Sequence, residues 1–200
     1  MPNHHITRSD VQNARTAYGA REPRDLFYRT AIELVSLSID GKTSLTLTDA
    51  IAGLLQTWNR EFYRFRGGFS EQHYGEIDTL LREHLPTILK YRARRISDLV
   101  ETDLAEVNRI FHAFEVVLGP VGAAKSLHLL APGYFPLWDR KITAAYGLSL
   151  GSTGTNSSKY WQMMFYSFEQ AQSLIDEGYT GNPLKAIDEF NYCHFSREWI

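Results

Sequence analysis

The sequence of 200 residues has one cysteine, Cys193, and a formal net charge of only −2 at pH 7. A single cysteine excludes a disulfide framework and a cysteine-rich zinc site. The near balance of charges argues against a protein that binds nucleic acid through strong overall attraction. A local basic face is still compatible with such a balance.

Segments for membranes and for export are missing as well. No apolar run approaches the roughly 18 residues that span a bilayer, and the opening MPNHHITRSD lacks the basic-then-apolar pattern of a signal peptide. We therefore expect a cytoplasmic protein without a membrane partner. The sequence also lacks GxxxxGK(S/T), HExxH and a Cys/His ligand spacing, so we expect no nucleotide cofactor, no other cofactor and no metal.

Alternating strand patterns are almost absent, and KTSLTLT (residues 42–48) is the one weak candidate. Nearly every other segment repeats apolar residues at the 3.6-residue period of a helix. The ranges with this pattern are 8–18, 23–37, 48–65, 71–84, 86–93, 103–118, 123–131, 140–146, 159–175 and 183–192. Without a long linker or an internal repeat, the pattern predicts a compact all-α fold in one domain, residues 1–200.

Capping signals mark several of these helix starts. Thr48 is the expected N-cap of the third helix, and Asp103 and Glu106 have the spacing of a capping box. Asn182 is the expected cap of the last helix, because Pro183 then occupies its first position.

The segment LGPVGAAKSLHLLAPGYFPLWDRKI, residues 118–142, contains two features that helices usually avoid. A Gly-Pro-Val-Gly turn at 119–122 lies between two helical stretches, and Asp139 directly precedes another helix-like run. Glycines let the backbone turn sharply, and the free N–H groups at the next helix start can bind a DNA phosphate. The alternative is an ordinary corner between helices that ends in a glycine cap.

This segment resembles the helix-hairpin-helix DNA glycosylase superfamily. The superfamily hairpin reads Leu-Pro-Gly-Val-Gly and is followed by an apolar helix and a Phe-Pro or Pro-Val segment that ends in the catalytic aspartate. The resemblance covers a helix-hairpin-helix at about residues 104–131, which would border a cleft, and the acid at position 139. Pro and Gly are swapped in this hairpin and the path to the aspartate is shorter. The chain therefore resembles a diverged prokaryotic branch, similar to enzymes that remove modified bases from phage DNA.

The resemblance implies catalytic roles for two residues. Asp139 would stabilise the positive charge that builds on the sugar and would orient the attacking water. Its alternative role is to cap the next helix, and both roles can hold together. Lys125 lies one residue beyond the position of the nucleophilic lysine in bifunctional members, which turns its side chain by about 100°. A solvated or phosphate-contacting lysine is therefore the alternative, and simple hydrolysis to an abasic site follows from it.

A glycosylase must also hold a flipped base between flat side chains. Trp138 is the candidate for the pocket wall, Asn59 for reading a base edge and Tyr63 for stacking, although core packing or a polar helix face would also explain them. Candidate contacts to DNA phosphates are Gly119, Val121, Gly122, Arg66 and Arg140. The basic run KYRARR (residues 90–95) could follow a DNA backbone or be a solvated face. Polar residues of the last helix that could line the cleft are Lys185, Asp188, Asn191 and Tyr192.

These observations predict a monofunctional DNA glycosylase, a hydrolase that flips a modified base out of double-stranded DNA and leaves an abasic site. Glucosylated hydroxymethylcytosine of phage DNA is the expected base, which makes the function antiviral defence, and the protein is expected to be a monomer. The alternatives are a base-excision repair glycosylase for a damaged base, a non-catalytic helix-hairpin-helix module that binds DNA, and a helical interaction protein.

Overall fold

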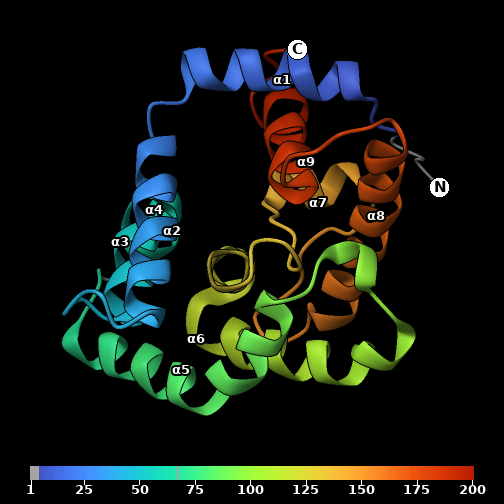
Figure 1. The fold of residues 1–200 in the computed structure, drawn as a ribbon. Helices are drawn as coiled ribbons and strands as arrows, with labels where there is room; N and C mark the ends of the chain where they lie inside the picture. The colour runs from blue at the N-terminus through green and yellow to red at the C-terminus, as the bar shows by residue number, and fades with distance from the viewer. Residues whose placement is uncertain (1–4, 67) are drawn as a thin grey trace.

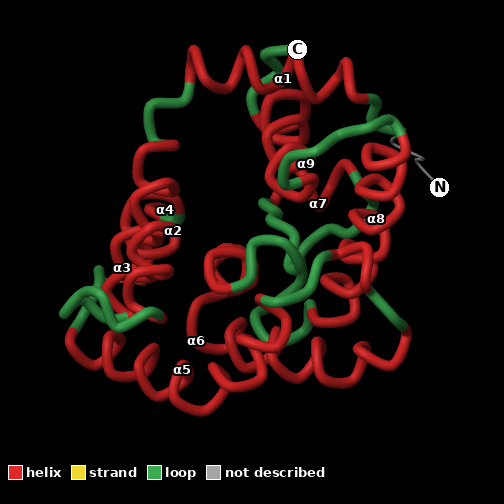
Figure 2. The backbone as a smooth tube through the Cα atoms, in the orientation of Figure 1, coloured by secondary structure: helices red, strands yellow, loops and turns green. Residues whose placement is uncertain are grey.

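The computed structural model describes residues 5–66 and 68–200, with the side chain of Arg66 outside that description. Every regular element in the described residues is helical, as Figure 2 shows, so the predicted all-α fold is confirmed. The α-helices are α1 (Arg8–Arg21), α2 (Asp25–Ile39), α3 (Leu47–Trp58), α4 (Arg60–Arg66), α5 (Glu71–Arg92), α6 (Leu104–Leu130), α7 (Arg140–Ala145), α8 (Ser157–Asp176) and α9 (Pro183–Asn191). Short 3-10 turns cover Ile96–Asp98 and Glu101–Asp103, and a π-turn, η3, covers Tyr192–Ser196.

The observed helix starts test the capping signals. Asn182 accepts a hydrogen bond from the Leu184 amide ahead of Pro183, as predicted. Thr48 is wrong as the N-cap of α3, because Thr46 takes that position and forms the capping box. The strand predicted at KTSLTLT is also wrong, because its last two residues, Leu47 and Thr48, begin α3.

The capping box predicted from Asp103 and Glu106 is also wrong. Asp103 has α-helical backbone angles and its side chain caps nothing at the start of α6. Its carboxylate instead accepts hydrogen bonds from Arg94, at 2.9 Å, and from the Tyr134 hydroxyl, at 2.6 Å. A tertiary ion pair has therefore replaced the local cap.

Two predicted helix boundaries differ from the structure. The single helix expected at residues 48–65 ends at Asn59, whose φ of −127° and ψ of 31° separate α3 from α4. Conversely, α5 continues through Pro86, where two helices were expected. Proline lacks an amide hydrogen, but Pro86 faces solvent while the helix buries His84 and Ile88 on its inner face. Tertiary packing on both sides of the proline therefore keeps α5 continuous.

Helix α6 is broken at Gly119, which has a φ of 70° and a ψ of 167°. Residues with a Cβ essentially never adopt this combination. A Cβ at this position would also lie 2.8 Å from the Phe62 ring of α4. Pro120 follows at once and opens the second half of α6, where its missing amide hydrogen costs little.

Gly119→Ala is expected to destabilise the fold by more than the roughly 1–3 kcal/mol of such backbone strain, because Phe62 must also move. Denaturant unfolding measures the change. Gly75→Ala, in the second turn of α5 with open space around the added Cβ, is the control. It should stabilise the protein by about 0.5–1 kcal/mol. Equal stability of the Gly119→Ala variant and the wild type would contradict this account of the corner.

The helices form two groups around α6. In Figure 1, α2, α3 and α4 lie on one side of α6, and α7, α8 and α9 lie on the other. Helix α2 packs along α3, α8 packs against both α6 and α9, and α5 packs under α6. Helix α1 crosses between the two groups and packs against α9, so the first and last helices are in contact.

By length and composition alone, the segment Glu101–Leu130 is apolar enough to cross a membrane. The expectation that no such segment exists was therefore wrong by composition. In the fold, 67% of its most apolar window is buried inside the protein, and Gly119 interrupts the helix. Burial against neighbouring helices accounts for the apolar character of α6.

Candidate functional site

An open pocket of about 1390 Å³ lies where the two helix groups face each other. Its wall combines the ends of α3 and α4, the Gly119 corner, the start of α7 and the π-turn η3. Two carboxylates, Glu61 and Asp139, line it. Cationic side chains outnumber them and are Arg24, Arg60, Lys125, Arg140, Lys141 and Arg197. The pocket is therefore a locally basic surface on a nearly neutral protein.

A smaller inner pocket of about 60 Å³ adjoins the open one. The inner wall adds Asp188 of α9 and Trp138 to the residues common to both pockets. The residues that line both pockets are Arg24, Trp58, Lys125, Asp139 and Tyr192. Asp139 and Lys125 therefore lie at the junction of the two spaces.

The loop at residues 131–139, which carries Asp139 to this junction, is fixed by buried hydrogen bonds. The Trp138 indole Nε1 donates to the Pro120 carbonyl at 2.9 Å, which ties the loop to the Gly119 corner. The Tyr160 hydroxyl of α8 donates to the Pro136 carbonyl, also at 2.9 Å. The loop before α7 is consequently held against the Gly119 corner of α6 and against α8.

His128 of α6 also holds this loop in place, through a hydrogen bond to its backbone. Its Nδ1 donates to the Phe135 carbonyl at 2.7 Å, so its Nε2 accepts from the Tyr28 hydroxyl at 2.9 Å. Burial lowers the pKa of His128 to about 4. The ring is therefore neutral, and it links α2, α6 and the loop as a structural group.

Asp139 is the N-cap of α7, as the alternative interpretation predicted. Its Oδ1 accepts from the Ile142 amide at 2.8 Å. Its Oδ2 accepts from the Ser196 hydroxyl of η3 at 2.7 Å, so the carboxylate is held at both oxygens. The side chain remains partly exposed to the pocket. Capping and access to the pocket occur together.

Lys125 is not the solvated lysine that its one-residue offset favoured. Its Nζ donates to the Trp58 carbonyl and lies 6.0 Å from the centre of the Trp58 ring. Burial lowers the pKa of Lys125 to about 8, against the opposing pull of the Asp139 and Asp188 carboxylates. The second half of α6 thus directs an amine of reduced basicity into the pocket junction.

The three residues predicted for a base pocket have different positions. Asn59 lines the open pocket, where it lies against Gly122, and its Nδ2 is buried without an acceptor among the described residues. Trp138 forms a wall of the inner pocket but is only 1% exposed. Tyr63 is outside both pockets: it is 3% exposed and its ring contacts His73. Tyr63 therefore cannot stack on a ligand in this pocket.

Of the predicted phosphate contacts, Gly119, Val121 and Arg140 line the open pocket. Gly122 does not, because it is buried under a neighbouring side chain. Its lack of a Cβ serves packing inside the protein, not the approach of a phosphate. The predicted contact of Arg66 concerns a side chain outside the described residues.

The basic run at residues 90–95 is largely committed to the fold. Arg92 donates to the Leu130 carbonyl and the Ser36 hydroxyl, at 2.7 Å and 3.0 Å. Arg94 donates to both oxygens of Asp103. Arg92 therefore holds the end of α6, and Arg94 holds the turn that precedes its start. Neither guanidinium is available to bind a DNA backbone.

Two of the four polar residues proposed from the last helix do reach the site. Asp188 lines the inner pocket and Tyr192 lines both pockets. Asn191 instead accepts from the Tyr146 hydroxyl at 2.9 Å, away from both pockets. Lys185 lies just behind the inner wall.

The ammonium group of Lys185 is enclosed by aromatic rings and carboxylates. Ring centres lie 4.5, 4.7 and 5.4 Å from its Nζ, and the rings belong to Tyr18, Tyr28 and Trp58. Carboxylate oxygens lie 3.5–3.7 Å away and belong to Asp25, Asp188 and Glu189. This lysine joins α1, α2, α3 and α9 directly behind the inner pocket.

Sequence reasoning missed a group of residues in the pocket walls, of which Glu22 lines the inner pocket and Arg24 lines both. Glu22 accepts two hydrogen bonds from the Arg24 guanidinium, both at 2.8 Å, and a third from the Tyr192 hydroxyl. The Arg24 bonds are the main reason that the pKa of Glu22 falls to about 2. Ser196 and Arg197 line the open pocket. No local motif marks these residues, because the contacts join positions up to 170 apart in the sequence.

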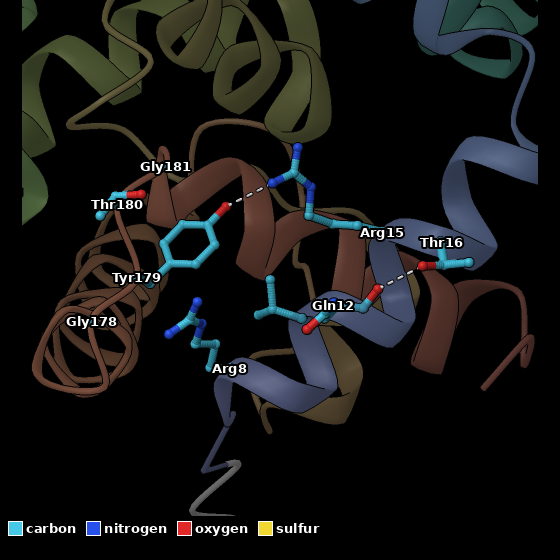
Figure 3. Close-up of a pocket in the computed structure, with 9 residues that line it drawn as sticks. Arg8, Gln12, Arg15, Thr16, Gly178, Tyr179, Thr180 and Gly181 are labelled. Atoms are coloured by element: carbon cyan, nitrogen blue, oxygen red, sulfur yellow. Dashed lines mark hydrogen bonds between the residues drawn. The ribbon is translucent and has the colours of Figure 1, made fainter.

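A separate surface pocket of about 620 Å³ lies between α1 and the loop before α9. In Figure 3, Arg15 reaches the Tyr179 hydroxyl, at 3.2 Å, while Arg8 lies on the other side of the Tyr179 ring. The pocket has no lining residue in common with the other two. None of the predicted site residues lines it.

Comparisons with protein-family models, with curated proteins and with solved structures each found no match to this chain.

Proposed function

We propose that the protein is a DNA glycosylase that hydrolyses the N-glycosidic bond of a flipped base. The observation that carries the proposal is the position of Asp139, which lies where a narrow inner pocket opens into a wide basic one. The wide pocket also includes the Gly119 corner, so the acid and the hairpin that resemble a glycosylase border the same space.

The chemistry of glycosidic hydrolysis fits this arrangement. As the base departs, positive charge builds on the sugar, and a carboxylate aimed at C1′ stabilises it and orients the attacking water. Asp139 is fixed for such a role by its two hydrogen bonds. The cationic lining, with Arg60 and Arg140 exposed, suits the phosphates on either side of the flipped nucleotide. The exposed rim aromatics Phe27 and Phe65 can contact bases.

The pocket sizes support a base with a large substituent. A space of about 60 Å³ accepts only part of a base, whereas the adjoining space of about 1390 Å³ can hold a bulky group attached to it. We propose the glucosylated hydroxymethylcytosine of phage DNA as the substrate and antiviral defence as the purpose.

The proposal is tested with phage DNA that carries glucosylated hydroxymethylcytosine and with the same DNA without the modification. Abasic sites are counted as alkali-labile breaks after incubation with the protein. We expect breaks in the modified DNA and few in the unmodified DNA. Equal counts, or strong activity on uracil or oxidised guanine, would favour a repair glycosylase. Binding without any excision would favour a non-catalytic module.

Lys125 favours a second activity, cleavage of the strand after excision. An amine with a pKa near 8 is partly unprotonated at neutral pH and can form a Schiff base with the sugar. Treatment with borohydride during the reaction would trap such an intermediate on Lys125. Simple hydrolysis leaves no trapped complex.

A further inference from the structure

Among the described residues, Asp188 is one of three carboxyl groups in the wall of the inner pocket, together with Asp139 and Glu22. Glu22 is bound by the Arg24 guanidinium. Asp188 comes from α9, whereas Asp139 begins α7. Its side chain is 12% exposed, and the Lys185 ammonium lies 3.7 Å from its Oδ2. Within the described residues no donor makes a hydrogen bond to this carboxyl group. It therefore borders the pocket with one ion pair, to Lys185, and without a hydrogen bond that fixes its proton elsewhere.

The carboxyl groups of Asp139 and Asp188 have contrasting environments. Asp139 accepts hydrogen bonds at both oxygens, which suits a carboxylate. Burial raises the pKa of Asp188 to about 6, and the negative charges of Glu189 and Asp139 add to the rise. Lys185 and Lys125 oppose it. Other titratable groups around this part of α9 are Tyr18 of α1, Asp25 and Tyr28 of α2, and Cys193 of η3.

Resting on the proposed glycosylase function, we propose that Asp188 is its general acid, which donates a proton to the departing base while Asp139 serves the sugar and the water. The C1′–N bond breaks and its electron pair stays on the base nitrogen. The Asp188 carboxyl proton is transferred to the base, and the water oxygen bonds to C1′. The proton lost by that water goes to Asp139, and exchange with solvent restores both groups.

Enzymes combine a general acid and a charged stabiliser in one site by giving two neighbouring carboxyl groups different environments, so that one keeps its proton and the other does not. A pyrimidine leaves poorly as an anion, so protonation lowers the barrier for excising a cytosine derivative. General acid catalysis of this kind contributes roughly 10²–10⁴-fold to a rate. The inner pocket, with Trp138 and Trp58 as walls, keeps bulk water from competing for the proton.

The test is Asp188→Asn, compared with Glu189→Gln as the matched control. Glu189 is the next carboxylate on α9 and also contacts Lys185, at 3.5 Å, but it lines neither the inner nor the open pocket. We expect Asp188→Asn to slow single-turnover excision at least about 100-fold. Glu189→Gln should change the rate far less, because it only removes a charge that raises the pKa of Asp188 and so moves the pH dependence to lower pH. The wild-type rate should fall as pH rises above about 6, and Asp188→Asn should lose that dependence.

The leaving group provides a readout that damage to the fold would not mimic. A glucosylated hydroxymethylcytosine that is also methylated at N3 keeps its 5-substituent, carries a positive charge at neutral pH and leaves as a neutral base, so it needs no proton from the enzyme. Asp188→Asn should therefore recover much of its rate on this base, while Asp139→Asn should not. If Asp188→Asn excises every substrate at the wild-type rate and with the wild-type pH profile, the general acid assignment is wrong although the glycosylase proposal stands. If the wild type excises no base at all, the glycosylase proposal itself fails.

Discussion

Asp139→Asn is expected to bind DNA as tightly as the wild type and to excise bases about 10²–10³-fold more slowly. Asparagine caps helices as well as aspartate does, and its side-chain oxygen can still accept from the Ile142 amide that Asp139 now binds. The fold and the start of α7 should therefore persist. What disappears is the negative charge that stabilises the sugar as the base departs. Binding is measured by titration of labelled duplex and excision by single-turnover kinetics.

Glu61→Gln is the control for this substitution. Glu61 is the other carboxylate of the open pocket, but it is exposed and does not line the inner pocket. Its replacement should leave the excision rate unchanged and strengthen DNA binding slightly. A folded Asp139→Asn variant with full excision activity would leave Asp139 with a capping role alone.

Lys125→Met is expected to stabilise the protein by roughly 2 kcal/mol at pH 7, because removing the buried amine relieves most of the cost of its lowered pKa. The pKa of Lys125 in the fold is about 8, against an ordinary value of 10.5. The lost hydrogen bond to the Trp58 carbonyl offsets about 1 kcal/mol of the gain. Methionine has a similar length and no charge, so the pocket wall remains filled.

The pH dependence separates this explanation from simple repacking. Below pH 8 the lysine is protonated in both the folded and the unfolded chain, so the variant has its full advantage there. Between pH 8 and 10.5 the folded protein loses the proton first, and the wild type recovers stability as pH rises. The gain measured by denaturant unfolding should therefore shrink by pH 10. A constant difference from pH 7 to pH 10 would show that the buried charge is not its source.

Features that depend on residues close together in the sequence could be predicted, and features that depend on distant residues could not. The caps at Asn182 and Asp139 could be predicted because each side chain binds an amide within three residues of itself. The corner at Gly119 was readable because glycine and proline act on their own backbone. Asp103 was misread because its partner Tyr134 lies 31 positions away.

The site shows the same limit more strongly. The stripe that includes Tyr63 was recognised as helical, but the break at Asn59 rotates α4 relative to α3 and directs Tyr63 toward His73. Glu22 and Arg24 carry no motif, and they contact Tyr192 and Arg197 at the other end of the chain. A single sequence contains no signal for such contacts.

The contact of Glu22 and Arg24 with Tyr192 also determines when the site can form. Proteins are synthesised from the N-terminus, and helices that emerge first can fold before the rest. The growing chain has α2, α3 and most of α6 long before it has Asp188, Tyr192 or the Ser196 hydroxyl that binds Asp139. A ribosome-bound intermediate thus lacks two residues of the inner pocket wall, Asp188 and Tyr192. If the chain is the glycosylase proposed above, its site stays incomplete during synthesis until α9 and η3 are translated.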